Sequence, residues 1–144
     1  MTTALPTTNR SLPIALLRAR ERVMGPIRAL LSDVDLTEQQ WRVLRVVQES
    51  GAIDPTQIAE QACLLLPSLT RILQKLEDKK MISRTRDKQD RRKQVITITS
   101  GGEAVIANNL EASLVLVAKT RAEMGEDRYE ALLDLLNELD RIKL

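Results

Sequence analysis

The stretch Asp87-Lys88-Gln89-Asp90-Arg91-Arg92-Lys93 joins two short segments that have the composition of β-strands. Residues 82–86 (ISRTR) precede it, and residues 94–99 (QVITIT), which are rich in β-branched side chains, follow it. Two such segments separated by a short polar loop predict a β-hairpin. The tip of this hairpin carries four cations and an aspartate that can orient one of them. A basic hairpin of this shape can reach into a groove of nucleic acid.

Positive charge is concentrated in the same part of the chain. The net charge of the whole sequence is only +2, yet residues 71–93 contain ten basic and four acidic residues, and residues 94–144 contain five basic and nine acidic ones. A local basic segment of this kind indicates a polyanionic partner, whereas the acidic remainder favours solubility.

The composition excludes several classes of function. The chain has no histidine and a single cysteine, so neither a Cys/His zinc site nor a histidine-dependent catalytic triad can form within one chain. No paired nucleophile and base and no phosphate-binding glycine loop is evident, so we expect neither an enzyme nor a bound cofactor or metal. The early apolar segment, residues 12–31, is interrupted by charges and predicts no membrane span. We therefore expect a cytoplasmic protein that does not enter membranes.

Apolar periodicity and capping signals predict a mainly helical chain with a small β-hairpin. The first helix begins near residue 12, and Gly25-Pro26 should bend or interrupt it. Thr37-Glu38-Gln39-Gln40 is a capping box that starts a helix to about residue 49, and Ser100-Gly101-Gly102-Glu103 has the pattern of another. The last two helices have more apolar surface than one chain of this size can cover, which predicts a homodimer.

Two short helices predicted between the capping box and the hairpin form a helix-turn-helix. Asp54-Pro55 suits the start of a helix to about residue 62, and Pro67 suits the start of a second one to about residue 79. The predicted organisation is a flexible arm at 1–11, a winged helix-turn-helix domain at 36–99, and a helical dimerisation region at 12–35 and 100–144.

The second helix and the hairpin supply the candidate DNA contacts. Leu69, Leu73 and Leu76 share one face of the helix, so polar and basic side chains that can contact base edges and phosphates occupy the other. In the hairpin, Asp90 can fix the rotamer of Arg92 for insertion into a minor groove. The residues expected to contact DNA are Ser68, Thr70, Arg71, Gln74, Lys75, Arg84, Arg86, Lys88, Asp90, Arg91 and Arg92.

These elements resemble the MarR family of winged-helix regulators. The family's wing signature is Asp-x-Arg followed after five residues by an aliphatic residue and Thr, and Asp90, Arg92, Ile98 and Thr99 match it. The resemblance covers about residues 12–144. In three stretches, residues 16–21, 36–42 and 63–70, it extends to the family's repressors of aromatic-acid degradation. Lys80 stands where the family commonly has glycine, which predicts a strained backbone there.

The resemblance implies a homodimeric repressor that binds a palindromic operator in double-stranded DNA. It also implies that a small phenolic or aromatic acid releases the DNA. Arg20, Trp41 and Arg42 are candidates for that effector site, because arginine pairs with carboxylates and tryptophan stacks on aromatic rings. Alternatively, Trp41 belongs to the core, and the two arginines form ion pairs with Glu21, Glu38 or a partner chain.

Two further alternatives remain open at this stage. Cys63 could sense oxidants, but its place in an apolar turn favours a buried structural cysteine. The winged helix could also bind only protein, in which case affinity for duplex DNA would be small and nearly independent of salt.

Overall fold

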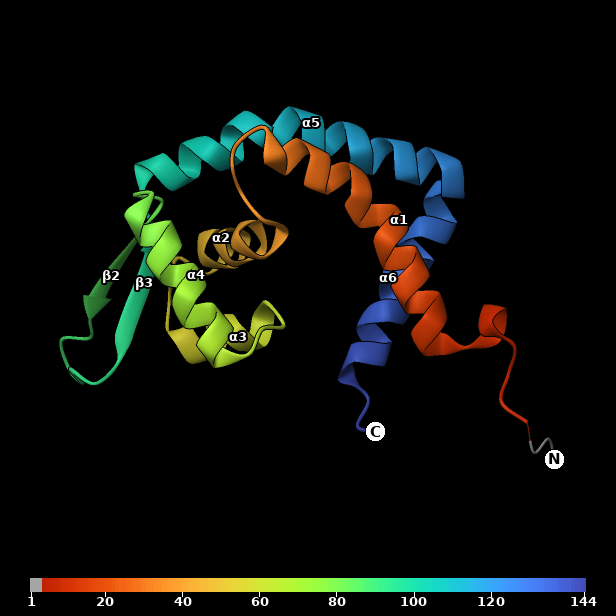
Figure 1. The fold of residues 1–144 in the computed structure, drawn as a ribbon, viewed down its shortest axis with the longest axis horizontal. Helices are drawn as coiled ribbons and strands as arrows, with labels where there is room; N and C mark the ends of the chain where they lie inside the picture. The colour runs from red at the N-terminus through yellow and green to blue at the C-terminus, as the bar shows by residue number, and fades with distance from the viewer. Residues whose placement is uncertain (1–3) are drawn as a thin grey trace. The chain divides into compact units, whose positions relative to one another are not determined.

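The computed structural model describes residues 4–144, which fold into helices and one small sheet (Figure 1). The elements, in chain order, are η1 (Thr8–Arg10), α1 (Leu12–Ser32), α2 (Glu38–Ser50), β1 (Ala52–Ile53), α3 (Pro55–Gln61), α4 (Leu66–Asp78), β2 (Ile82–Arg86), β3 (Gln94–Ile98), α5 (Ser100–Met124) and α6 (Glu126–Arg141). They form two compact units, one up to Asn108 and the other from Asn109 to Leu144. The mainly helical fold with a β-hairpin wing is as predicted.

The sheet has three antiparallel strands in the order β1-β3-β2. The predicted hairpin is formed by β2 and β3, with Arg84 opposite Ile96 and Arg86 opposite Gln94. Ile53 of β1, for which the sequence predicted no strand, pairs with Ile96 from the other side. A strand of two residues has no periodicity of its own, and its partner lies more than forty residues away.

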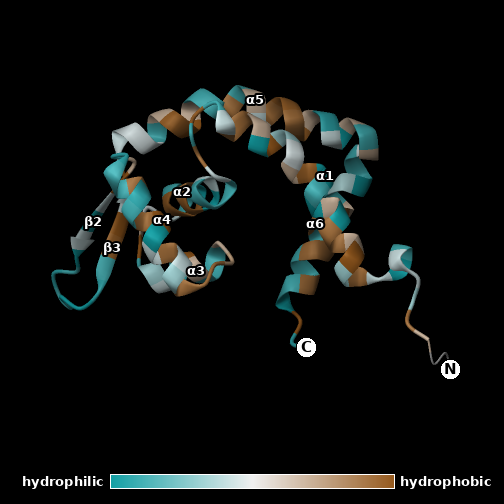
Figure 2. Ribbon diagram, in the orientation of Figure 1, coloured by the Kyte–Doolittle hydropathy of each residue, from teal (hydrophilic) through white to brown (hydrophobic). Residues whose placement is uncertain are grey.

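An aliphatic core holds α2, α3, α4 and the sheet together. Leu44, Ile58 and Ile96 are completely buried, and so are the α4 residues Leu69 and Leu76. In Figure 2, β3 and parts of α2 and α4 are among the hydrophobic segments. Because the α4 leucines follow helical spacing, burying one stripe fixes which side of the helix remains in solvent.

Local capping explains where α2 and α3 begin. The Thr37 hydroxyl accepts a hydrogen bond from the Gln40 amide, and the Gln40 side chain accepts one from the Thr37 amide, which confirms the predicted capping box. Asp54 caps α3 in the predicted way. Helix α4 begins at Leu66, one residue earlier than expected, and no side chain caps it.

The junction between the wing and α5 differs from the sequence prediction. The residue that caps α5 is Thr99, because its hydroxyl accepts from the Gly102 amide. The predicted box at Ser100 was therefore misplaced by one residue. The Thr99 hydroxyl also donates to the carbonyl oxygen of Lys80, over 2.6 Å. Lys80 has a φ of 60°, so the strained backbone predicted there is confirmed.

Helix α1 runs without interruption through Pro26, and Figure 1 shows that its axis changes direction part-way along. The prediction of a bend therefore holds, while an interruption does not occur. Among residues 4–144, no helix is both long enough and apolar enough to cross a membrane.

The second unit consists of the later part of α5 and of α6, which meet at Gly125 (φ 89°). Arg121 braces this corner, because it pairs with Glu126 and Glu130 and its guanidinium lies 4.4 Å from the centre of the Tyr129 ring. Both helices expose large apolar side chains, namely Leu110, Leu114, Val115 and Val117 on α5 and Leu132, Leu133, Leu135 and Leu136 on α6.

Candidate nucleic-acid interface

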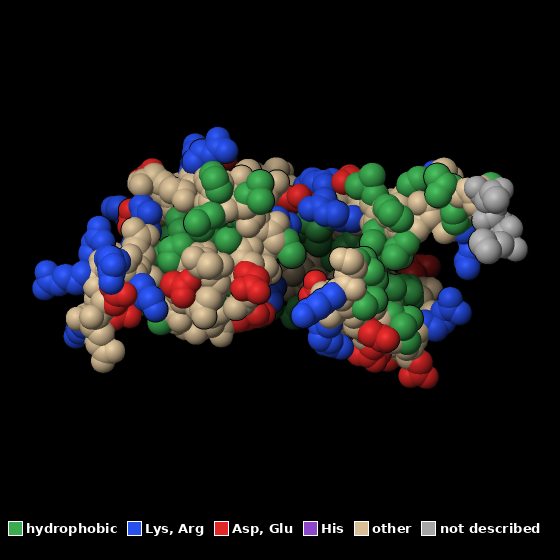
Figure 3. Space-filling model, turned by 90° about the horizontal axis from the view of Figure 1, so that it is seen from below, with side chains coloured by type: hydrophobic (Ala, Val, Ile, Leu, Met, Phe, Trp, Pro, Cys, Tyr) green, Lys and Arg blue, Asp and Glu red, His purple; other side chains and the backbone are tan. Residues whose placement is uncertain are grey.

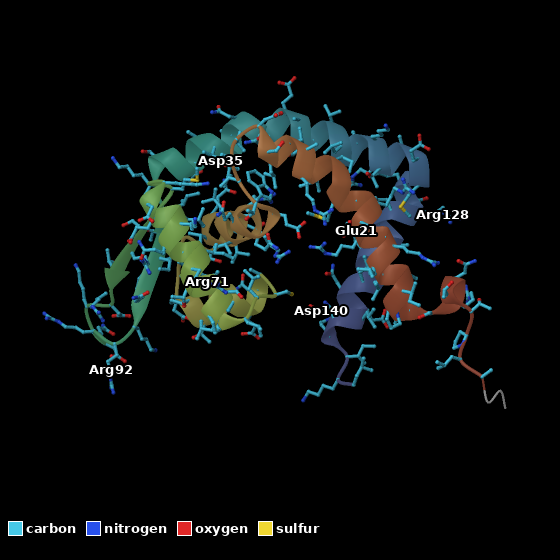
Figure 4. The ribbon with its side chains drawn as sticks, viewed as in Figure 1. Glu21, Asp35, Arg71, Arg92, Arg128 and Asp140 are labelled. Atoms are coloured by element: carbon cyan, nitrogen blue, oxygen red, sulfur yellow. The ribbon has the colours of Figure 1, made fainter. Side chains whose placement is uncertain are left out.

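Helix α4 presents a polar and basic face to solvent. Arg71, Gln74 and Lys75 are exposed, and Ser68 is half-buried. Thr70 is also exposed, and its hydroxyl donates to the carbonyl oxygen of Leu66 over 3.0 Å. Figure 4 labels Arg71 on this helix. The structure therefore brings together on one surface the α4 residues that the sequence selected.

Hydrogen bonds within the wing order its tip. The Asp87 amide donates to Lys93, and the Asp87 carboxylate accepts from the Gln89 amide over 2.8 Å. The Arg86 guanidinium donates to the carbonyl oxygen of Arg91, also over 2.8 Å. These contacts close the loop without using the side chains of Arg91 or Lys93, so those cations remain exposed.

Asp90 lies beside Arg92, as the sequence predicted. One carboxylate oxygen accepts from the Arg92 amide at 3.1 Å and lies 3.5 Å from its Nε atom. The Arg92 side chain is nevertheless 95% exposed, and it extends from the end of the wing in Figure 4. The aspartate therefore biases the direction of the guanidinium while leaving its donors available.

Arg84 occupies a different position from the other wing cations. Its guanidinium pairs with Glu77 at 2.8 Å and with the Gln74 side chain at 2.7 Å, and the side chain is only 19% exposed. The hydrogen bond from Arg84 holds the pKa of Glu77 below its ordinary value of 4.5. Arg84 thus ties β2 to α4, an arrangement that the sequence did not reveal because the partners belong to different elements.

The N-terminal end of α4 and the tip of the wing lie on the same side of this unit, at the lower edge of Figure 1. A groove of about 360 Å³ lies between them, and its lining includes Thr56, Leu66, Arg86 and Arg92. Figure 3 views this side and shows basic side chains clustered over the wing. Thr56 and Leu66 were not among the predicted contacts.

The candidate effector residues lie on α1 and α2. Arg20 pairs with Glu38 over 2.6 Å and lies 3.7 Å from Glu21, and Arg28 reaches the other Glu38 oxygen at 3.3 Å. The ion pairs foreseen as an alternative for Arg20 are therefore present. The hydrogen bond from Arg20 is the main cause that lowers the pKa of Glu38, whose side chain is only 12% exposed.

Trp41 is half-buried and packs against the core, in agreement with its alternative interpretation. Arg42 is half-buried as well, and its positive charge helps to lower the pKa of Glu38. Its buried Nε atom makes no hydrogen bond within residues 4–144. Arg20 and Arg42 thus both stabilise the ionised carboxylate of Glu38.

Cys63 is exposed and has a φ of 54°, so the expectation of a buried cysteine is wrong. The tight turn between α3 and α4 places its side chain outside the core. Within the described part of the chain, no group of three acidic or cysteine side chains could hold a metal ion.

Comparison with known proteins identifies the family. The model of the MarR family matches residues 36–94, which include α2, α3, α4, β2 and the wing loop up to the first residue of β3. The chain is 35% identical to the HTH-type transcriptional regulator FarR of Neisseria gonorrhoeae, over 96% of this chain and 97% of that protein. The chain belongs to the MarR family. It is also 36% identical to the homoprotocatechuate degradative operon repressor of Escherichia coli, over 89% of this chain and 86% of the repressor.

Solved structures agree with this assignment. The structure of NadR in complex with 4-hydroxyphenylacetate has a TM-score of 0.87 and 34% identity, and covers 99% of this chain and 100% of NadR. The repressor CouR bound to a 23-mer DNA duplex has a TM-score of 0.82 and 28% identity, with 98% and 100% coverage. Proteins of this family are transcriptional regulators and not enzymes.

Proposed function

We propose that this protein is a cytoplasmic transcriptional repressor that binds a palindromic operator as a homodimer. The observation that carries the proposal is the polar and basic face of α4, which lies on the same side as an ordered basic wing. In this arrangement α4 enters the major groove, where Ser68, Arg71 and Gln74 contact base edges. The exposed Arg92 enters the adjacent minor groove, where the negative potential is greatest.

Dimerisation would use the apolar side chains exposed on α1, α5 and α6, which water would otherwise surround. Two copies related by a two-fold axis place their recognition helices in successive major grooves, roughly 34–36 Å apart. A palindromic operator matches that symmetry.

Titration of fluorescent duplex DNA at two salt concentrations tests the proposal. The duplex is the DNA upstream of the protein's own gene, and a scrambled duplex of equal length is the control. We expect tighter binding to the upstream DNA and a decrease of log K with log salt of about 0.9 per neutralised phosphate. Weak binding to both duplexes without salt dependence would instead favour a winged helix that binds only protein.

We further propose that a small aromatic acid is the effector that releases the DNA. The support is the similarity to a homoprotocatechuate operon repressor and to NadR, which was solved with 4-hydroxyphenylacetate. Arg20 would pair with the carboxylate, and Trp41 and Arg42 would contact the ring and its substituent. An effector shifts the equilibrium only if it binds the DNA-free conformation more tightly.

Calorimetry with 4-hydroxyphenylacetate tests the effector and its site. We expect Arg20→Ala to weaken binding about tenfold or more, because a charge-assisted hydrogen bond is lost. Arg22→Ala, which removes the same charge from the same helix, is the control and should bind like the wild type. Equal affinities of wild type and Arg20→Ala would remove Arg20 from the site.

A further inference from the structure

The first turn of the recognition helix carries two leucines that point into solvent. Leu65 is the residue at the N-cap of α4 and is 78% exposed, and Leu66, the first helical residue, is 48% exposed. The other α4 leucines, Leu69, Leu73 and Leu76, are buried. Leu65 and Leu66 therefore contribute little to the core.

An apolar side chain at the N-cap position of α4, Leu65, also makes the helix less stable than a polar one would. Thr37 and Asp54 cap α2 and α3, whereas Leu65 cannot accept a hydrogen bond from the first amides of α4. The backbone at Leu65, with φ −71° and ψ 144°, has the conformation that a capping Ser, Thr or Asp requires. A polar residue would fit and would stabilise the helix, so neither packing nor capping explains the leucine.

The location of the pair indicates what it contacts. Leu66 lines the groove whose other walls include Arg86 and Arg92 of the wing. Seen from the side of the wing tip and the start of α4, hydrophobic side chains are gathered next to the basic wing (Figure 3). An apolar surface that is bordered by cations fits a ligand that combines apolar groups with a dense negative charge.

We propose that the side chains of Leu65 and Leu66 contact the C5-methyl groups of operator thymines. The inference rests on the proposed operator binding. It extends the interface to two apolar residues, which cannot form hydrogen bonds to the bases and were therefore not among the predicted contacts. Residues at the N-terminus of a recognition helix are the ones that reach base edges. In the major groove, thymine is the base that displays a methyl group, and apolar side chains recognise it.

Uracil substitution tests the proposal without changing base pairing. A duplex is first selected from a random pool with the wild-type protein, and each thymine is then replaced singly by uracil. We expect at least one substitution in each half-site to weaken wild-type binding about fourfold, the effect of removing one buried methyl group. When the leucine that contacts this methyl group is replaced, as Leu65→Ala or Leu66→Ala, the same uracil substitution should no longer weaken binding of the duplex.

Leu65→Ser separates recognition from folding. Because serine can cap α4, this variant should unfold at a higher temperature than the wild type, while it loses the discrimination of thymine from uracil at the positions that Leu65 contacts. Leu5→Ala, which truncates an exposed leucine outside the helices, is the matched control and should keep that discrimination.

Three results would contradict the inference. If no uracil substitution changes wild-type binding, methyl recognition is excluded, whereas the proposed operator binding is not. Leucine variants that retain the full uracil effect would assign it to other residues. Failure of the wild type to select any duplex would overturn the proposed operator binding itself, and the inference with it.

Discussion

The guanidinium of Arg92 leaves its hydrogen-bond donors free while Asp90 limits its directions. We predict that Arg92→Ala weakens operator binding and reduces the slope of log K against log salt by about 1, because one cation leaves the interface. The loss should be similar for all operator sequences of equal minor-groove width, since this residue recognises shape and charge. Fluorescence anisotropy at four salt concentrations measures both quantities.

Arg141→Ala provides the control for Arg92, because it removes the same charge from the end of α6. Its salt slope should equal that of the wild type. An unchanged slope for Arg92→Ala would show that this guanidinium does not enter the DNA interface.

The sequence predicted contacts between side chains where the two residues are near neighbours in the chain. Asp90 and Arg92 are two residues apart, so their contact could be predicted from their spacing. The pairing of Arg84 with Glu77 crosses from a strand to a helix, and its geometry depends on the turn at Lys80. The exposure of Cys63 likewise follows from a turn whose direction the apolar composition did not indicate.

Gly102 controls how closely α5 approaches the wing. A Cβ atom there would collide with the carbonyl oxygen of Met81 and would lie 2.7 Å from Ile98 Cγ1. We predict that Gly102→Ala destabilises the protein by roughly 1–3 kcal/mol, because the backbone must shift. Thermal denaturation followed by circular dichroism measures the change.

Gly25→Ala is the matched comparison for Gly102→Ala. Gly25 sits inside α1, and no atom of residues 4–144 beyond its chain neighbours and the nearby helix backbone lies within 4 Å of a Cβ built there. Alanine should therefore stabilise the helix by about 0.5–1 kcal/mol. Destabilisation of equal size in both variants would mean that the close approach at Gly102 does not determine the result.

The contact between α1 and α2 should depend on pH through Glu38. Since pairing with Arg20 lowers the pKa of Glu38, the ionised form stabilises the fold above about pH 4.5, and this contribution is lost as the pH falls through the lowered pKa. We predict that Glu38→Gln lowers the melting temperature at pH 7 and that the difference from wild type shrinks towards pH 3. Glu49→Gln, on the same helix, is the control and should differ little at either pH.

Helix starts were largely predictable because capping is local. The Thr37 box and the Asp54 cap each need only four consecutive residues. The start of α5 was misplaced because Thr99 and Ser100 are both suitable caps, and only the hydrogen bond to Lys80 selects Thr99. The strand at Ile53 was missed because its partner strand, and not its own sequence, defines it.

For the whole molecule, the exposed leucines of α6 lead to a prediction about assembly. If they pack against a second copy, Leu136→Arg should convert the dimer into a monomer with a mass of 16.2 kDa. The variant should also bind a palindromic duplex no better than a single half-site, because the two recognition helices are no longer linked. Light scattering and anisotropy measure the two effects.

Glu138→Arg changes a charged residue on the same helix to the same side chain and serves as the control. It should remain dimeric. A dimeric Leu136→Arg would place the subunit interface elsewhere. The sequence predicted that these helices need a partner, because their apolar surface exceeds what one chain can cover, but it could not indicate which residues meet.

Helix α4 divides its two tasks between opposite faces. Leu69, Leu73 and Leu76 secure it to the core, whereas Leu65 and Arg71 are exposed to solvent. Substitutions on the second face should therefore alter DNA preference at little cost in folding free energy. A lineage built on this scaffold could acquire new target genes in small steps, each of which leaves a folded regulator. For the same reason, libraries randomised on that face alone are a practical starting point for engineering new operator specificities.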